Sequence, residues 1–326
     1  MTTEKLNLIE NEKAIKLIKD TFERKLSNEL FLTKVSAPLF VLSDSGLNDD
    51  LSGTERAVKF DVKSGETAVI VHSLAKWKRM ALKKYGFMIG EGLYTNMIAV
   101  RRDENLSRIH SYYVDQWDWE AVISKKERTI EKLKETVRKI YHAIKETEKV
   151  IHETYSDLKP KLPEDIFFIT SEDLFKLYPM LTPKEREKEL ARQYGAIFII
   201  GIGNKLSSGE PHDTRAPDYD DWSLNGDILV YYKPLDIALE LSSMGIRVDE
   251  NSLTKQLKLA NCVDRLKYPF HMELINSNLP YTIGGGIGQS RLCMFYLNKL
   301  HISEVQVSIW PKFMLDEMNQ KDIFPL

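Results

Sequence analysis

The chain has 326 residues, of which 43% are hydrophobic and 29% charged, and it contains only 16 glycines and 12 prolines. This composition is typical of a globular enzyme and excludes a disordered or fibrous chain. The 46 lysines and arginines nearly balance the 48 aspartates and glutamates. No global basic field therefore indicates a nucleic-acid partner or an anionic membrane surface.

The sequence also limits the compartment in which the protein is expected. No apolar run approaches the roughly 18 residues that span a bilayer, and the N-terminus lacks the apolar stretch of a secretory signal. Cys262 and Cys293 lie far apart, so we expect two reduced thiols and neither a disulfide nor a zinc site. These features predict a soluble cytoplasmic protein with no membrane partner.

The N-terminal quarter is predicted to form one helix followed by short strands. Apolar residues at spacings of three and four within 10–30 predict a helix with one apolar face, which needs a cover. Residues 31–40 include Pro38 and favour an edge strand, because proline cannot donate to an interior ladder. Segments 55–62 and 67–73 then predict two strands joined by a Ser-Gly turn.

A lysine-rich helix over 74–84 leads into a predicted antiparallel hairpin. Its strands are expected at 92–102 and 110–120. In the second strand, side chains alternate between the two faces of the sheet. Gln116 and Asp118 are therefore predicted to share one face, and two tryptophans the other.

The second half of the chain contains two further helices and several strands. A capping box of Ser124 and Glu127 predicts the start of a long helix that runs to about Tyr155. Thr182 and Pro183 open another helix. Strands are predicted at residues 196–203, 226–232, 237–248 and 305–310. Because few regular crossover helices separate the strands, we expect an α+β fold in which helices flank a large antiparallel β-sheet. We expect one catalytic domain over residues 1–326.

Two glycine-rich segments do not match the common nucleotide-binding motifs. GIGNKL at 201–206 lacks the third glycine of the dinucleotide fingerprint, and GGGIGQSR at 284–291 lacks the lysine of the P-loop. The second segment has four glycines followed by Arg291. Glycines there indicate either a β-bulge or the close approach of a planar ligand beside the arginine.

Several charged residues are candidates for ligand binding. Arg101, Arg102 and Glu104 lie at the mouth of the hairpin, where they would form either a phosphate grip or a surface ion pair. Asp227 and Glu240 on neighbouring strands would hold Mg²⁺ together with substrate phosphates, or would be solvated. The acidic segment that follows His212 indicates either a cationic ligand or a solvated loop.

Seven motifs together resemble one enzyme family over essentially the whole chain. They are HSLAKWKR (72–79), GEGLYT (90–95), HSYYVDQWDWE (110–120), RAPDYDDW (215–222), LNGDILV (224–230), ELSSMGIRVD (240–249) and IGGGIGQSRL (283–292). The chain closely resembles ammonia-dependent asparagine synthetases, that is, aspartate-ammonia ligases. This resemblance implies the catalytic fold of class II aminoacyl-tRNA synthetases and a homodimer. It also implies ATP-dependent amidation of L-aspartate by ammonia to L-asparagine, AMP and pyrophosphate through a β-aspartyl adenylate, with Mg²⁺.

The resemblance also implies roles for matching positions. ATP would be held by Arg101 at the α-phosphate, Glu104 near the adenine, Gly286, Gly288 and Arg291. Asp227 and Glu240 would bind Mg²⁺. Lys78 and Arg247 would hold a carboxylate of aspartate, with Asp49, Ser73, Gln116, Asp118, Asp220 and Ser243 around the amino acid. Either Asp118 or Asp220 would deprotonate ammonium. The segment 10–40 resembles the first class motif, which implies that a two-fold interface covers the apolar helix.

The chain departs from the family pattern at Arg102, where a proline is expected, so either Arg101 or Arg102 would contact the α-phosphate. The link from Asp221 to Asp227 is also shorter than in some relatives, which implies a reduced lid. Two alternatives remain open. One is an aspartyl-tRNA synthetase-like enzyme, and the other is a non-catalytic relative that binds an amino acid or a nucleotide.

Overall fold

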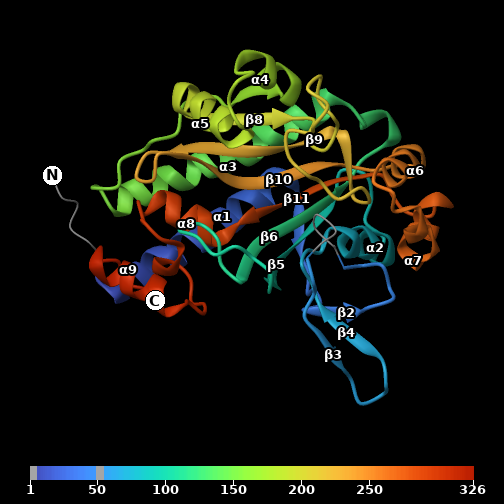
Figure 1. Ribbon diagram of the computed structural model, residues 1–326, viewed down its shortest axis with the longest axis horizontal. Coiled ribbons are helices and arrows are strands. Elements are labelled where there is room, and N and C mark those ends of the chain that lie inside the picture. Colours follow the sequence, from blue (N-terminus) through green and yellow to red (C-terminus); the bar gives the residue numbers. More distant parts are fainter. Residues whose placement is uncertain (1–5, 49–54) are drawn as a thin grey trace.

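A computed structural model describes residues 6–48 and 55–326 of the protein. Its centre is an eight-stranded sheet in the order β1-β5-β6-β11-β10-β9-β8-β7 (Figure 1). The strands are β1 (Leu32–Lys34), β5 (Gly92–Val100), β6 (Tyr113–Val122), β7 (Phe167–Thr170), β8 (Ala196–Ile200), β9 (Asp220–Tyr232), β10 (Ile237–Arg247) and β11 (Thr282–Gly288). The six inner strands are antiparallel, as predicted, whereas β1 and β7 pair in parallel with β5 and β8 at the two edges.

Helices cover both faces of this sheet. They are α1 (Leu8–Leu30), α2 (Ala75–Tyr85), α3 (Ile130–Thr154), α4 (Ser171–Leu177), α5 (Pro183–Tyr194), α6 (Glu250–Leu259), α7 (Pro269–Ile275), α8 (Gln289–Tyr296) and α9 (Lys312–Gln320). On one face, α1, α3 and α8 pack with the sheet into the main hydrophobic core. On the other face, α4 and α5 pack against β8 and β9 in a smaller core.

The apolar face of α1 is covered within the same chain. Ile18, Phe22 and Leu26 are fully buried in the main core beside α3. The Phe22 ring lies 4.7 Å from the Trp117 ring, measured between centroids. The expectation that a two-fold interface covers this face is therefore wrong, and a core contact explains the apolar spacing.

Three further local predictions needed correction. The capping box of Ser124 and Glu127 lies at the start of a single 3₁₀ turn, and the long helix α3 begins at Ile130 with Thr129 as its N-cap. Residues 305–310 are not a strand. The strand predicted over 31–40 is divided into β1 and β2 (Phe40–Leu42), because Pro38 lies between them. The predicted hairpin β5–β6 and the helix α5, which Gly195 closes, are both confirmed.

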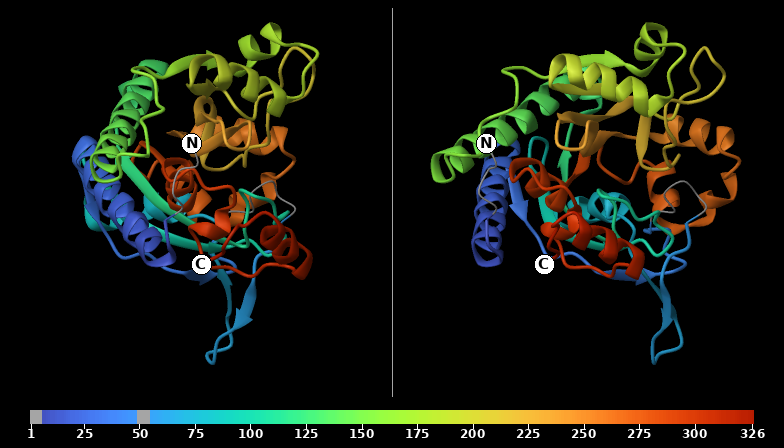
Figure 2. Two further views of the ribbon diagram at one scale, coloured as in Figure 1. Left: turned by 90° about the vertical axis from the view of Figure 1, so that its left-hand side faces the viewer. Right: turned by 60° about the vertical axis from the view of Figure 1, so that its left-hand side comes forward.

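A small second sheet, β2-β4-β3, projects from the body of the molecule (Figure 2). Strands β3 (Lys59–Asp61) and β4 (Thr67–Ile70) form the hairpin predicted around the Ser-Gly turn. In the described part of the chain, no helix combines the length and apolar character needed to cross a bilayer.

Candidate active site

A cavity of about 500 Å³ lies on the sheet between the hairpin β5–β6 and strands β9, β10 and β11. Twelve of the fifteen predicted site residues line it: Ser73, Arg101, Glu104, Gln116, Asp118, Asp220, Glu240, Ser243, Arg247, Gly286, Gly288 and Arg291. Lys78 and Asp227 are not among the lining residues. Asp49 lies outside the described residues. The structure therefore brings together, in one place, groups that are widely separated in sequence.

Lys78 is fully buried next to the lining residue Asp118. Its ammonium group donates to the Asp118 carboxylate, to the Trp119 carbonyl at 2.8 Å and to the Gly285 carbonyl at 3.1 Å. A lysine has three protons to donate, so all of them are used within the protein. In this arrangement Lys78 orients Asp118 rather than facing a substrate.

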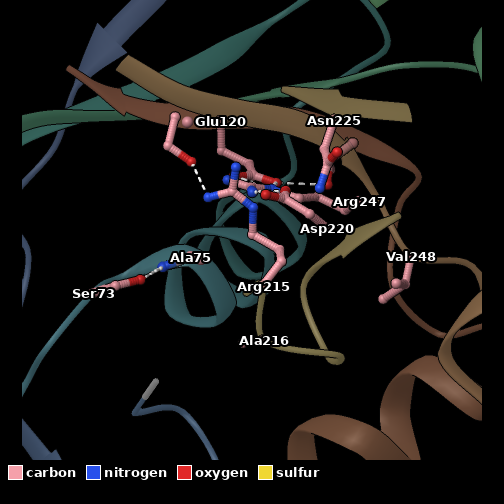
Figure 3. A network of polar contacts seen from close by, with 12 residues as sticks. Ser73, Ala75, Glu120, Arg215, Ala216, Asp220, Asn225, Arg247 and Val248 are labelled. Atoms are coloured by element: carbon pink, nitrogen blue, oxygen red, sulfur yellow. Dashed lines mark hydrogen bonds and ion pairs between the residues drawn. The ribbon is translucent and has the colours of Figure 1, made fainter. Parts of the chain in front are cut away.

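Arg247 lies between two buried carboxylates at the cavity wall (Figure 3). Its Nε donates to Glu120 Oε1 at 2.9 Å and its Nη2 to Glu120 Oε2 at 2.7 Å, while Nη1 donates to Asp220. Burial alone would raise the pKa of Glu120, but the charges of Arg247 and Lys78 outweigh burial and hold that pKa below its usual value. Glu120 therefore remains charged and links the two cations.

Two glycines of β11 leave room for side chains of β6. A Cβ atom on Gly284 would lie 2.0 Å from Glu120 Oε2, and one on Gly286 would lie 2.4 Å from Gln116 Oε1. Such contacts are far inside van der Waals distance, so side chains at these positions would displace Glu120 and Gln116. The glycine run therefore permits the neighbouring strand's polar side chains to cross over it.

Asp220 lies in a group of buried charges at this wall. Lys78 and Arg247 pair with Asp118, Glu120 and Asp220, and the nearby charge of Arg215, which pairs with Asp227, also acts on Asp220. The Oδ2 atom of Asp220 is buried and accepts no hydrogen bond from the described residues. A buried carboxylate oxygen without a donor is costly, so this position favours a cationic nitrogen on a ligand.

A second charged group lies along β9 and β10. Arg215 donates at 2.6 Å both to Asp227 Oδ1 and to Ser243 Oγ. Arg291 donates to the Glu240 carbonyl at 3.1 Å and lies 3.5 Å from its carboxylate. Burial and the charge of Glu240 raise the pKa of Asp227 to about 6, although Arg215 opposes this shift. The pKa of Glu240 itself stays below its usual value, because the charges of Arg291 and Lys184 outweigh its burial. Carboxylate oxygens from two neighbouring strands are donors that suit a divalent cation.

A β-bulge places Glu240 and Ser243 on the same side of β10. The pairing with β9 shifts by one residue between Glu240 and Ser242. The extra residue reverses the alternation that the sequence predicted beyond Glu240. As a result Ser243 and Arg247 face the cavity with Glu240, while Ser242 is buried.

Within the acidic segment 212–221, Asp218 is neither exposed to solvent nor available to a cationic ligand. That carboxylate is fully buried, and its Oδ2 lies 2.9 Å from Lys76 Nζ and 3.0 Å from both Arg265 and His271. Burial opposes ionisation of Asp218, but the charges of Lys76 and Arg265 and the contact with His271 hold the pKa of Asp218 well below its usual range. The segment is anchored by pairs within the protein, which fixes the backbone next to Asp220.

At the mouth of the hairpin, Arg101, Arg102 and Glu104 all line the cavity. Arg101 is half-buried and lies 3.9 Å from Glu104, and its Nε has no hydrogen-bond acceptor among the described residues. Arg102 is exposed. Asp103, the next residue, pairs with Arg56. Arg101 is thus the better placed of the two arginines for a phosphate.

Three lining or supporting residues were not predicted as site residues: Glu120, Arg215 and His110. Glu120 shares the strand face of Gln116 and Asp118, so alternation alone was a usable signal for it. Burial and the charges of Arg291 and Arg101 lower the pKa of His110 to about 4, so it is neutral. No spacing rule pointed to Arg215.

Comparison with known proteins decides the family. The model of the aspartate-ammonia ligase family matches residues 9–322. The chain belongs to this family. It is 61% identical over 318 residues to the aspartate-ammonia ligase of Fusobacterium nucleatum, with 98% of this chain and 97% of that protein covered. It is 53% identical over 321 residues to the ligase of Pediococcus pentosaceus, covering 98% and 96%.

The fold of this ligase family member also resembles solved tRNA synthetases. The asparaginyl-tRNA synthetase of Pyrococcus horikoshii, complexed with asparaginyl-adenylate, superposes with a TM-score of 0.68 at 15% identity. That match covers 92% of this chain and 70% of the synthetase. The corresponding complex from Entamoeba histolytica gives a TM-score of 0.66 at 16% identity, and this chain spans 66% of it. The class II catalytic fold predicted from the sequence is confirmed.

Proposed function

We propose that this chain joins ammonia to the β-carboxylate of L-aspartate through a β-aspartyl adenylate, releasing AMP, pyrophosphate and L-asparagine. Membership of the ligase family at up to 61% identity supports asparagine synthesis. The observation that favours the adenylate route is the cavity itself. Arg101 and Arg291 both act on His110 and Glu240, whereas Arg247 forms a separate group with Glu120 and Asp220, called the Arg247 group below. Both sets line the same cavity, and we infer that the first receives the phosphates of a nucleotide and the second the amino acid.

A carboxylate does not accept ammonia directly, because the anion would have to expel oxide. Adenylation masks the charge and supplies AMP as the leaving group. In this step Arg101 and Arg291 would stabilise the charge that develops on the phosphoryl oxygens. A charge pair at about 4 Å contributes about 4 kcal/mol at an effective dielectric constant near 20. Positioning of the two reactants supplies much of the remaining acceleration.

We assign Mg²⁺ to Glu240 and Asp227. Their donors are hard oxygens, which Mg²⁺ prefers, and the charge of Glu240 acts on Asp227 from the neighbouring strand. When bound, Mg²⁺ would offset charge on the ATP phosphates. Arg215 engages Oδ1 of Asp227, so Oδ2 of Asp227 would be the oxygen that binds the ion together with Glu240.

The magnesium assignment predicts the behaviour of a Glu240→Gln variant. Its turnover at limiting Mg²⁺ is expected to fall at least about a hundredfold, because an amide is a weaker and uncharged ligand. The thermal midpoint should change little, since Glu240 is partly exposed at the cavity. Steady-state rates over a Mg²⁺ titration, with Glu189→Gln on the exposed face of α5 as a control, measure this. Normal turnover of Glu240→Gln at limiting Mg²⁺ would refute the role.

We assign the second step, attack of ammonia on the adenylate, to Asp220 as base. The contacts of Asp118 and Asp220 favour one of these two candidates for the base that deprotonates ammonium. Asp118 is engaged by Lys78 and by the Leu74 amide at 3.3 Å. Asp220 retains a free buried oxygen, which favours it as the acceptor of the ammonium proton.

The product nucleotide tests the proposed function. Purified protein is incubated with ATP, Mg²⁺ and aspartate, with ammonium, glutamine or neither, and all products are quantified. Asparagine formed from ammonium with equimolar AMP and pyrophosphate would support the proposal. Asparagine with ADP would overturn the adenylate. Aspartate-dependent pyrophosphate exchange without asparagine would favour the tRNA synthetase-like alternative, which has only 14 to 16% identity to support it.

We also propose that residues 1–326 form a single catalytic domain and that two copies of the chain form a homodimer. The cytoplasm, where ATP is supplied, is the proposed location. Support for the dimer comes from exposed apolar side chains near β1, β5 and the small sheet: Phe31, Phe40, Leu42, Phe60, Met88 and Ile89. Phe31, Met88 and Ile89 are each more than 60% exposed, and such clusters mark interfaces. A monomeric mass in sedimentation equilibrium would refute the dimer. No nucleic-acid partner is proposed, since the net charge is only −2.

A further inference from the structure

The carboxylate of Asp115 joins three elements that are distant in sequence. Projecting from β6, its Oδ1 accepts from the backbone amide of Ser290 at 3.0 Å and from the Ser290 hydroxyl at 2.7 Å. Its Oδ2 accepts from Lys19 Nζ of α1 at 3.1 Å. Asp115 is 7% exposed and Ser290 2% exposed. These contacts connect α1, β6 and the start of α8.

Helix α8 needs an acceptor from outside its own sequence. The first amides of any helix lack intrahelical acceptors, and the residue before α8, Gly288, has no side chain to provide one. Ser290 is the second residue of the helix, whose amide a capping oxygen usually satisfies. Asp115 therefore supplies the cap from another strand, and its negative charge lies at the positive end of the helix.

The residue that follows Ser290 is Arg291, in the same first turn. Arg291 lines the cavity and donates to the Glu240 carbonyl at 3.1 Å. Any rotation or fraying of this turn moves the guanidinium group. We propose that Asp115 is a positioning residue that sets the place of Arg291 and so the binding of ATP, an inference that rests on the proposed function.

A further contact joins the cap to the cavity wall. Gln306 Nε2 donates to Ser290 Oγ at 3.0 Å, and Asp115, Ser290 and Gln306 all line the cavity. The hydroxyl of Ser290 is thus held on both sides, as donor to Asp115 and as acceptor from Gln306. Rotation of the first turn of α8 would break these bonds, and Lys19 holds the second oxygen of Asp115.

Asp115→Ala removes both bonds to Ser290 and is expected to raise KM for ATP about tenfold, the scale of a lost helix cap. KM for aspartate should stay within about twofold, because the Arg247 group is not touched. Asp115→Asn retains an acceptor oxygen for both Ser290 donors, so its KM for ATP should stay within about threefold of the original protein. Asp20→Asn, an exposed carboxylate of α1 paired with Lys16, is the matched control and should change neither constant.

Steady-state kinetics in both substrates, with thermal midpoints, measure these effects. A purely structural role would lower the midpoint and the active fraction while leaving both KM values unchanged, and that result overturns the inference. An equal rise in KM for ATP in Asp115→Ala and Asp115→Asn would also overturn it. If Asp115→Ala fails to fold, Ser290→Ala replaces it. This variant loses the hydroxyl bonds only, and an unchanged KM for ATP there contradicts the proposal.

An Arg291→Ala variant distinguishes failure of the positioning role of Asp115 from failure of the ATP-binding role of Arg291. If Arg291→Ala raises KM for ATP and Asp115→Ala does not, only the positioning role fails. If Arg291→Ala leaves KM for ATP unchanged, the assignment of the ATP site itself fails.

Discussion

An Arg247→Met variant is expected to lose at least about a hundredfold in kcat/KM for aspartate, because truncating a buried hydrogen-bonded charge pair costs about 2 to 5 kcal/mol. The same change leaves Glu120 and Asp220 buried, 0% and 1% exposed, with no guanidinium between them. The free energy of unfolding should therefore also fall, by about 3 to 5 kcal/mol. Denaturant unfolding and initial-rate kinetics measure the two losses separately.

Two further variants interpret this result. Arg192→Met removes an arginine whose ion pairs with Glu189 and Asp236 are exposed, and it should leave both the free energy of unfolding and the aspartate kinetics nearly unchanged. Arg247→Lys keeps the charge but cannot bridge two carboxylates with a planar group, so kcat/KM for aspartate should remain low. A value for Arg247→Met within threefold of the original protein would show that Arg247 does not bind the substrate.

An Asp220→Asn variant is expected to separate the two chemical steps. An amide cannot accept the proton of ammonium, so asparagine formation should fall about a hundredfold or more, the usual contribution of a general base. Adenylate formation needs no such proton transfer, so aspartate-dependent pyrophosphate release should fall much less. Hydroxylamine is largely uncharged at neutral pH, so it should restore much of the rate in Asp220→Asn as an alternative nucleophile.

Asp118→Asn is the matched comparison for this experiment. Both residues line the cavity as buried carboxylates, but only Asp220 has an oxygen without a hydrogen-bond donor among the described residues. If hydroxylamine rescues Asp118→Asn and not Asp220→Asn, the base is Asp118. If hydroxylamine rescues neither variant, neither carboxylate acts mainly as the base.

The pattern of residues along the chain was sufficient to predict those parts of the fold that depend on neighbours in sequence. The hairpin β5–β6 follows from alternation, and the same alternation placed Gln116 and Asp118 on the cavity face. The start of α5 follows from the proline and capping residues at 182–185. Most of the site residues came from the seven motifs of the resemblance, and the roles given to them remain predictions.

Long-range packing explains the features that sequence reasoning missed. Glu120 and Arg247 are 127 positions apart, and only the pairing of β6, β11 and β10 brings them together. The bulge after Glu240 depends on how β10 pairs with β9, and no glycine or proline marks it. Lys78 of α2 contacts Asp118 and Trp119 of β6. Its burial therefore results from the packing of α2 on the sheet, which the sequence of the helix alone does not reveal.

The most direct test of the adenylate follows oxygen atoms. Aspartate labelled with ¹⁸O in its β-carboxylate is converted with ATP, Mg²⁺ and ammonium, and the phosphorus products are examined by mass spectrometry. Attack of the carboxylate on the α-phosphate predicts one labelled oxygen in AMP and none in pyrophosphate. Label in inorganic phosphate with ADP as the nucleotide product, or AMP without label, would contradict the β-aspartyl adenylate.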